Sequence, residues 1–374
     1  MNVNRKISAI SAPSVVKTHI SEIKTVDVLV VGAGPGGSAA AWRAAKAGYR
    51  VLVVERKKRI GEPVQCAEFI PGPMVDYARD DGVLSQHIEG MKTYLPSGTV
   101  APSPFPGLMV DRAAFDRALA ARAAAAGADI MIDTGLVALD ATRRIARVRH
   151  DDRSSEIHYQ LLMAADGPHS PVARLLGLPP LSVIQTRQYT VPLKAAYADT
   201  DIWLSDEFPG GYGWLFPKGG LANLGLGIDR QLKPDLKTPL EHLHGELVRQ
   251  GRVGPEVMQR TGGAIPVGGL RERLVYKHTL FIGDAGGFTH PITGAGIAAA
   301  VQSGERAGLA AVEYIDGNVR ALESYAEDMR EQYGPTLARA VERRAELARH
   351  WRSAQANDDP VQRRGWIAFR EYFA

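Results

Sequence analysis

Residues 26–37, with the sequence VDVLVVGAGPGG, decide the fold of this chain. An apolar run at 28–31 leads into a Gly-x-Gly-x-x-Gly turn, and an alanine-rich, helix-like segment follows. A strand, a turn of this kind and a helix in direct succession are typical of a dinucleotide-binding unit. Glycine lets the backbone approach a pyrophosphate, and the helix directs free N–H groups and a partial positive charge at it. We therefore expect a dinucleotide site here; the alternative is a plain glycine-rich turn.

The second half of the unit supplies an acidic residue. A second apolar run, 51–54, ends in Glu55. At this distance beyond the turn, a carboxylate accepts hydrogen bonds from an adenosine ribose. The predicted cofactor-binding residues of the unit are Gly32, Gly34, Pro35, Gly36, Gly37, Glu55 and Arg56.

Composition narrows the class of protein. The 374 residues include 45 basic and 41 acidic side chains, and the resulting net charge of +4 gives no reason to expect a nucleic-acid partner. The single cysteine, Cys66, excludes an internal disulfide and disfavours a cysteine-based metal cluster, so we expect no metal and a cytoplasmic location. No apolar stretch approaches the roughly 20 residues needed to span a bilayer. Residues 1–24 carry charges without an apolar core, so we interpret them as a flexible or strand-like lead-in rather than a secretory signal.

Changes in pattern along the chain predict a discontinuous α/β architecture. From about residue 183, short apolar segments joined by glycine turns predict antiparallel strands, and a strand at 279–282 returns to the first domain. We expect a Rossmann-like dinucleotide-binding domain with an inserted antiparallel β-sheet substrate domain and a helical C-terminus. The predicted boundaries are 25–75, 101–182 and 271–330 for the first domain, 76–100 and 183–270 for the second, and 331–374 for the C-terminal segment.

Three further patches follow the phosphate turn in a fixed order. Asp111 and Arg112 open a long helix, Ala-Asp-Gly-Pro-His-Ser occupies 165–170, and Phe-Ile-Gly-Asp-Ala at 281–285 precedes Pro-Ile-Thr-Gly-Ala-Gly-Ile at 291–297. Taken singly, Asp111 is explained as a helix cap and the Asp-Gly pairs as turns. The order of these motifs along the chain resembles that of FAD-dependent oxidoreductases of the aromatic hydroxylase fold. This superfamily includes class A flavoprotein monooxygenases, flavin-dependent halogenases and geranylgeranyl reductases.

The resemblance implies an FAD-binding domain of the glutathione-reductase type. By this likeness Glu55 binds the adenosine ribose, Arg112 lies near the diphosphate or ribityl chain, and Asp284 accepts from the ribityl hydroxyls. A helix that begins near Gly294 would direct its N–H groups at the flavin pyrimidine ring and stabilise reduced flavin. The predicted FAD residues of these patches are Cys66, Arg112, Asp166, Gly167, Gly283, Asp284, Pro291, Gly294, Ala295, Gly296 and Ile297.

A second dinucleotide fingerprint is missing. The glycine pairs 262–263 and 268–269 do not sit between a strand and a helix, so we expect no dedicated NAD(P) domain. The reductant is therefore expected to be NAD(P)H bound transiently, or a protein electron donor.

Two motifs bear on the reaction. Tyr212, Trp214 and Phe216, followed by Pro217, are similar to the Tyr-x-Trp-x-Phe-Pro signature of geranylgeranyl reductases. On a strand these aromatic residues share one face, where they form either a wall over an apolar substrate or part of the domain core. Cys66, in the loop 63–68, also resembles the reductases, in which a cysteine lies close to the flavin. It would tune or shield the flavin or help to protonate substrate; the alternative is a buried structural thiol.

The predicted catalytic residues are Cys66, Tyr212, Trp214 and His290, although a structural role is the alternative for His290. The chain departs from the reductases at Ala295, where the family usually has an acidic residue, and in its short C-terminal region.

We favour reduction of an alkene by hydride transfer, on an apolar, aromatic or prenyl substrate. The alternatives are a monooxygenase that hydroxylates an aromatic group through a flavin C4a-hydroperoxide, including a partner protein's side chain in quinone-cofactor maturation, and a redox-sensing flavoprotein that docks a partner. The arginine-rich helix before the C-terminus suggests peripheral membrane contact as an alternative to a solvated face.

Overall fold

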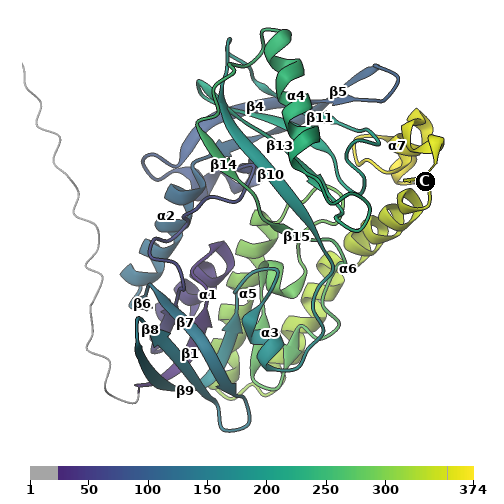
Figure 1. Ribbon diagram of the computed structural model, residues 1–374. Helices are drawn as coiled ribbons and strands as arrows, with labels where there is room; N and C mark the ends of the chain where they lie inside the picture. Colours follow the sequence, from purple (N-terminus) through teal and green to yellow (C-terminus); the bar gives the residue numbers. More distant parts are fainter. Residues whose placement is uncertain (1–23, 352) are drawn as a thin grey trace, which may run out of the picture.

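The computed structural model describes residues 24–351 and 353–374, so the expected lead-in lies almost wholly outside the described residues. The molecule contains two β-sheets, one in the lower and one in the upper half of Figure 1. A long helix runs from the lower sheet toward the C-terminus, which lies beside the upper sheet. Among the described residues, no helix is long and apolar enough to cross a membrane.

The first sheet carries the phosphate turn. Its strands are β1 (Lys24–Val31), β2 (Val51–Val54), β6 (Asp129–Met131), β7 (Thr134–Asp140), β8 (Ile145–His150), β9 (Arg153–Ala164), β16 (Val275–Tyr276) and β17 (Thr279–Phe281). The main path runs β16-β17-β9-β1-β2-β6, and β1 pairs in parallel with both β2 and β9. Strands β7, β8 and β9 form an antiparallel meander at its side. Because β1, β2, β9 and β17 are parallel, their carboxyl ends lie at one edge, where dinucleotides bind in sheets of this kind.

Helices cover the first sheet. They are α1 (Pro35–Lys46), α2 (Arg112–Ala125), α3 (Pro171–Leu175) and α5 (Ile297–Ile315). Glycines bring α1 and α5 close together, since a Cβ on Gly304 would lie 2.1 Å from the carbonyl oxygen of Gly36. Helix α2 begins at the predicted cap, because the side chain of Asp111 accepts a hydrogen bond from the N–H of Ala114 at 2.8 Å.

The second sheet is mixed rather than wholly antiparallel. Its strands are β3 (Phe69–Pro71), β4 (Leu84–Tyr94), β5 (Val100–Val110), β10 (Val183–Pro192), β11 (Asp199–Trp203), β12 (Gly213–Lys218), β13 (Leu221–Ile228), β14 (Gln259–Thr261) and β15 (Ala264–Pro266). The order is β14-β10-β13-β12-β11-β4-β5-β3, with β15 beside β10. Strand β4 pairs in parallel with β11, while the other pairs are antiparallel.

Two expected domain assignments differ from the structure. We assigned residues 69–71 to the dinucleotide domain, but they form β3 and pair with β5 in the second sheet. We also assigned residues 101–110 to the dinucleotide domain, but they form β5 and pair with β4. The hairpin turn at 95–99 is the reason, because it returns the chain antiparallel to β4 and the pairing continues to Val110. The other limits of the predicted domains stay predictions.

A helix and the C-terminal segment cover the second sheet. Helix α4 (Lys237–Arg249) packs leucine side chains against Tyr189 and Val191 of β10. The C-terminal elements are α6 (Ala321–Ala348), α7 (Asp359–Arg364) and the short 3₁₀ turns η3 (Ala354–Asn357) and η4 (Arg370–Tyr372); two others, η1 (Gly72–Ala78) and η2 (Gly283–Gly286), lie earlier in the chain. Trp366 and Phe369 are buried in one cluster with Trp214 of β12, so the aromatic tail packs as its composition indicates.

Candidate functional site

The three glycines of the phosphate turn differ in their surroundings. Gly32 has a φ of +104°, and a Cβ there would lie 2.3 Å from the carbonyl oxygen of Ala165 at the end of β9. A Cβ on Gly37 would lie 1.9 Å from the carbonyl oxygen of Gly32. At Gly34, by contrast, a Cβ would meet no atom within 4 Å. The outer glycines therefore allow the chain to pack, while the middle one leaves an open approach to the start of α1.

Glu55 is held against this turn. It follows β2 and is 8% exposed. Its Oε2 accepts a hydrogen bond from the N–H of Ala33 at 2.8 Å, and its Oε1 accepts from the N–H of Lys57 at 2.9 Å. Each carboxylate oxygen keeps a lone pair for a further donor. Glu55 is thus positioned to accept from a ribose hydroxyl. The side chain of Arg56 is exposed, and its contact with a cofactor stays a prediction.

Asp166 caps a helix. Its Oδ1 accepts from the hydroxyl of Ser170 at 2.7 Å, and its Oδ2 accepts from the N–H of Val172 at 2.8 Å, at the start of α3. Burial raises the pKa of the carboxyl, and these two hydrogen bonds oppose the change. Both oxygens therefore serve the fold, and a direct role of Asp166 or Gly167 in cofactor binding stays a prediction.

Asp284 presents a partly buried carboxyl at the end of the parallel sheet. Its Oδ1 accepts from the hydroxyl of Thr289, and in the described part of the chain no donor reaches Oδ2. Burial raises the pKa of Asp284, and the charge of Arg112 opposes the change only weakly. Gly296 lies beside Asp284 and Thr289, since a Cβ on Gly296 would come within 2.7 Å of the Thr289 hydroxyl. The free oxygen makes Asp284 a suitable acceptor for a cofactor hydroxyl.

Helix α5 begins at Ile297, where we expected the helical segment 297–314 to begin after Gly294. Gly294 belongs to a turn that also contains Pro291, Ala295 and Gly296, and its N–H donates to the carbonyl of His290 at 2.9 Å. The N–H of His290 in turn donates to the carbonyl of Ala295. The turn therefore closes on itself before the helix starts at Ile297. No side chain caps α5, so its first N–H groups remain available to an anionic group.

Arg112 is partly buried at the start of α2. Its guanidinium forms a bidentate ion pair with Asp116, with Nε–Oδ1 and Nη2–Oδ2 distances of 2.9 and 3.1 Å. Its backbone N–H donates to Glu68 Oε1 at 2.9 Å. Burial raises the pKa of Asp116, although Arg112 opposes the change. The structure thus brings Arg112 beside the Cys66 loop with part of its charge already paired.

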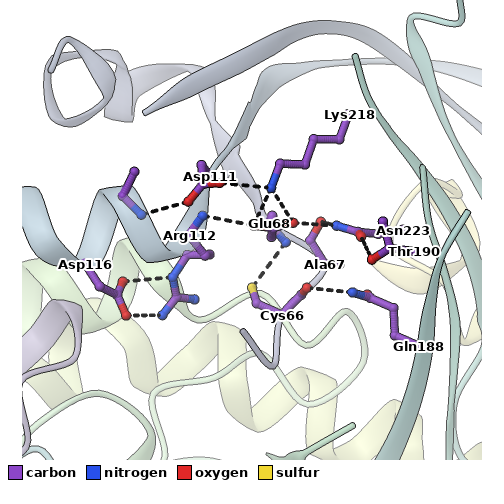
Figure 2. A network of polar contacts seen from close by, with 11 residues as sticks. Cys66, Ala67, Glu68, Asp111, Arg112, Asp116, Gln188, Thr190, Lys218 and Asn223 are labelled. Atoms are coloured by element: carbon purple, nitrogen blue, oxygen red, sulfur yellow. Dashed lines mark hydrogen bonds and ion pairs between the residues drawn. The ribbon is translucent and has the colours of Figure 1, made fainter. Parts of the chain in front are cut away.

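The Cys66 loop is tied to the second sheet through Gln188 (Figure 2). The Nε2 of Gln188 donates to the carbonyl oxygen of Cys66 at 3.0 Å, and its Oε1 accepts from the indole Nε1 of Trp214 at 3.2 Å. The N–H of Glu68 donates to Cys66 Sγ at 3.2 Å. Burial raises the pKa of the thiol more than the charge of Arg112 lowers it. Cys66 therefore holds its proton at neutral pH.

Glu68 is the centre of this network. It is 4% exposed and has a φ of +72°. The Nζ of Lys218 lies 2.9 Å from both of its oxygens, and the Nδ2 of Asn223 donates to Oε2 at 2.7 Å (Figure 2). The sequence patterns did not single out Glu68, Gln188, Lys218 or Asn223 as site residues. Two positions carried a signal: Glu68 lies two residues after Cys66, and Lys218 directly follows the aromatic motif.

The aromatic motif lines a cluster with the C-terminal segment. Tyr212, Trp214 and Phe216 gather in one apolar cluster, as their alternation predicts. The Tyr212 ring lies 4.9 Å from that of Trp366, centroid to centroid, and its hydroxyl donates to the carbonyl of Thr293 at 2.5 Å. Burial raises the pKa of Tyr212. The motif therefore joins the second sheet both to the turn before α5 and to the tail.

His290 holds the turn before α5. Its Nδ1 accepts from the N–H groups of Ile292 and Thr293, each at 3.3 Å, and its Nε2 lies 3.4 Å from the hydroxyl of Tyr372. Burial lowers the pKa of His290 to about 4, so the imidazole is neutral at pH 7. These contacts explain a structural role, and the acid/base role stays a prediction.

The phosphate turn, Glu55 and Asp284 define an FAD-binding oxidoreductase. The residues present fit the cofactor, because Gly34 is open, Asp284 keeps an oxygen free and α5 is uncapped. Residues 25–208 match the FAD binding domain, and residues 182–263 match the geranylgeranyl reductase catalytic domain. The chain belongs to the geranylgeranyl reductase family of FAD-dependent enzymes.

Full-length relatives support this assignment. The digeranylgeranylglycerophospholipid reductase of Methanosarcina acetivorans is 33% identical, with 84% of this chain and 82% of the relative covered. That of Thermoplasma volcanium is 31% identical, with 91% of each chain covered. The crystal structure of a geranylgeranyl bacteriochlorophyll reductase-like protein from Thermoplasma acidophilum is 29% identical and superposes with a TM-score of 0.82 over 93% of both chains. These matches confirm the predicted fold class. A flavin-dependent halogenase, 18% identical with a TM-score of 0.72 over 90% of this chain and 67% of its own, shares the fold alone.

Proposed function

We propose that this protein reduces the carbon–carbon double bonds of geranylgeranyl chains in a digeranylgeranylglycerophospholipid. The observation that carries the proposal is the match to a geranylgeranyl reductase catalytic domain over 182–263. This segment contains the aromatic motif and Gln188, which ties that motif to Cys66. The printed names of the relatives give the substrate class. No comparable observation favours hydroxylation of an aromatic group or docking of a partner protein.

The aromatic cluster suits a prenyl chain. Tyr212, Trp214 and Phe216 lie in one cluster with Trp366 and Phe369 of the tail. An apolar chain that lies along such side chains excludes water from a double bond and fixes its orientation. The C-terminal segment, although short, contributes to this surface because both of its aromatic residues are buried there.

Cys66 is the residue we assign to proton transfer. When bound, reduced FAD supplies the hydride that adds to one carbon of the double bond. The Sγ of Cys66 holds a proton at neutral pH because burial raises the thiol pKa. Transfer of this proton to the other carbon completes the saturated bond, and the thiolate regains a proton from water. The N–H of Glu68 and the charge of Arg112 stabilise the thiolate in the interval.

The electron donor is either NAD(P)H, bound transiently, or a donor protein. The match to a single FAD binding domain, with no second dinucleotide fingerprint in the sequence, supports this proposal. A substrate with two prenyl chains resides in a bilayer, so the protein is expected to meet the membrane surface peripherally.

An anaerobic single-turnover experiment tests the proposal. The FAD-loaded protein is reduced without oxygen and mixed with the unsaturated lipid. We expect the flavin to reoxidise and the lipid to gain two hydrogen atoms per double bond, measured by absorbance and mass spectrometry. The lipid with saturated chains is the control and should leave the flavin reduced. Reoxidation only after oxygen is admitted, with an oxygen atom added to the product, would contradict the proposal and indicate a monooxygenase.

A further inference from the structure

A positively charged pocket lies on the second sheet, and none of the predicted FAD residues lines it. It occupies about 590 Å³ between β10, β14 and the loop that leads into α4. Figure 1 shows β14 and β10 as neighbouring strands at one edge of this sheet, near α4. The charged residues that line it are Arg187, Arg230, Asp235, Lys237 and Arg260.

Four cationic side chains and one carboxylate line the pocket. One oxygen of this carboxylate, which belongs to Asp235, already accepts hydrogen bonds from the backbone. The Oδ1 of Asp235 accepts from the N–H groups of Lys237 and Thr238, at 2.8 and 3.3 Å, and so caps the start of α4. Lys237 has an exposed partner, Glu241, at 3.6 Å. For the arginines of the pocket, no ion pair forms within the described residues. Within the part of the chain that the structure describes, the pocket therefore keeps an excess of positive charge.

Two of the arginines converge from neighbouring strands. Arg187 and Tyr189 lie two residues apart on β10, so their side chains share the face that α4 covers. Arg260 of β14 is paired with Tyr189, and its guanidinium lies 5.5 Å from the centre of the Tyr189 ring. The Nε of Arg187 is buried and has no hydrogen-bond partner among the residues described. A buried donor of this kind is destabilising until an acceptor reaches it.

We propose that this pocket binds the phosphate group of a small molecule. Guanidinium groups match phosphate oxygens in both charge and fork geometry, and three of them, from Arg187, Arg230 and Arg260, line this pocket without an ion-pair partner among the described residues. The volume exceeds that of a phosphate alone, so an organic part fits beside it. Either the glycerophosphate of a lipid or a phosphate of a nicotinamide dinucleotide has this chemistry.

The pocket is connected to the Cys66 loop. Gly262 lines the pocket, and its carbonyl accepts a hydrogen bond from Nε2 of Gln65 at 2.6 Å. Gln65 directly precedes Cys66. Arg187 points to the face of β10 opposite to Gln188, whose side chain bonds the Cys66 carbonyl, so the pocket reaches the loop only through the Gly262–Gln65 hydrogen bond at the edge of the sheet. The anion chemistry goes beyond the proposed alkene reduction and does not depend on it.

Calorimetric titration of the FAD-loaded protein with inorganic pyrophosphate tests the site without turnover. We expect saturable binding that weakens at least tenfold in Arg187→Gln and in Arg260→Gln. Arg149→Gln is the matched control, because it removes the same charge from an exposed position on β8 in the other sheet, and it should bind like the parent protein. Arg260 is exposed, so its variant stays informative if Arg187→Gln fails to fold. Absence of binding at millimolar pyrophosphate, or equal weakening in Arg149→Gln, overturns the proposal.

Two kinetic comparisons identify the source of the phosphate. If a nucleotide supplies it, Arg260→Gln raises KM for NADPH or NADH and leaves KM for the lipid unchanged. If the lipid supplies it, the same variant raises KM for the phospholipid and not for a phosphate-free prenyl ether. Because the pyrophosphate titration needs no substrate, failure of the anion site and failure of the proposed reduction are separate results.

Discussion

The indole N–H of Trp214 donates to the side-chain amide oxygen of Gln188 at 3.2 Å. The same amide donates to the carbonyl of Cys66, so one side chain joins the aromatic strand to the thiol loop. Gln188 is 5% exposed, and its two hydrogen bonds are therefore protected from water. The relationship couples two motifs that lie far apart in the sequence.

Replacement of Gln188 by leucine is expected to destabilise the fold and loosen the loop. The change leaves the Cys66 carbonyl and the Trp214 N–H unpaired, which costs about 1–3 kcal/mol for each buried group. Gln185→Leu on the same strand is the control, because the described contacts include no hydrogen bond to its side-chain amide. Urea unfolding measures the difference. Equal stability of the two variants would show that the bridge contributes nothing.

The ion pair between Lys218 and Glu68 gives a second prediction. Lys218→Met leaves the Glu68 carboxylate buried with only neutral donors, which is expected to destabilise the protein by about 3 kcal/mol. The double variant Glu68→Gln with Lys218→Met removes both charges and is expected to recover much of that loss. Unfolding free energies of the single and double variants, compared as a cycle, measure the coupling. If the destabilisation of the double variant equals the sum of those of the two single variants, Glu68 and Lys218 are not coupled.

The phosphate turn allows a matched pair of glycine substitutions. Gly34→Ala is expected to fold and to lose FAD affinity, because its φ of −73° suits alanine and its Cβ would project into the open approach. Gly37→Ala is expected to disturb the fold itself, since its Cβ would lie 1.9 Å from the Gly32 carbonyl oxygen. Circular dichroism and FAD titration separate the effects. Unchanged FAD affinity in Gly34→Ala would place the diphosphate elsewhere.

Local features of the fold could be predicted from the sequence, whereas contacts between distant residues could not. The phosphate turn and the Asp111 cap depend on residues adjacent in the chain, so their patterns are visible without the fold. The Glu68–Lys218 pair joins residues 150 positions apart, and neither residue belongs to a motif that demands the other. Long-range contacts chosen by tertiary packing are therefore the part that local patterns miss.

The thiol of Cys66 is expected to react slowly with iodoacetamide. The thiolate is the nucleophile, and burial raises the pKa of Cys66, so less thiolate forms at pH 8 than in the unfolded chain. The rate of labelling should keep rising as the pH increases beyond about 8.5, the usual pKa of a thiol. Mass spectrometry of the labelled protein across pH 7–10 measures it, with the urea-unfolded protein as control. If the folded protein reacts as fast as the unfolded chain at pH 8, the proton-donor assignment loses its basis.

His290 is expected to make the protein less stable as the pH falls from 6.5 to 4. The unfolded chain binds a proton at histidine below a pKa of about 6.5, whereas burial lowers the pKa of His290 in the fold to about 4. Protonation therefore favours the unfolded chain across this window, and the full difference corresponds to about 3 kcal/mol. The loss should be nearly complete at pH 4 and absent above pH 7.

The variant His290→Asn isolates this effect. Its Oδ1 can replace Nδ1 as the acceptor for the N–H groups of Ile292 and Thr293, while the amide does not titrate. Asp116, Asp166 and Asp284 have pKa values raised by burial, so they act in the opposite sense, but equally in both proteins. We expect the unfolding free energy of the parent protein to fall relative to the variant between pH 6.5 and 4. Parallel curves across this range would show that the His290 imidazole accepts its proton as readily in the fold as in water.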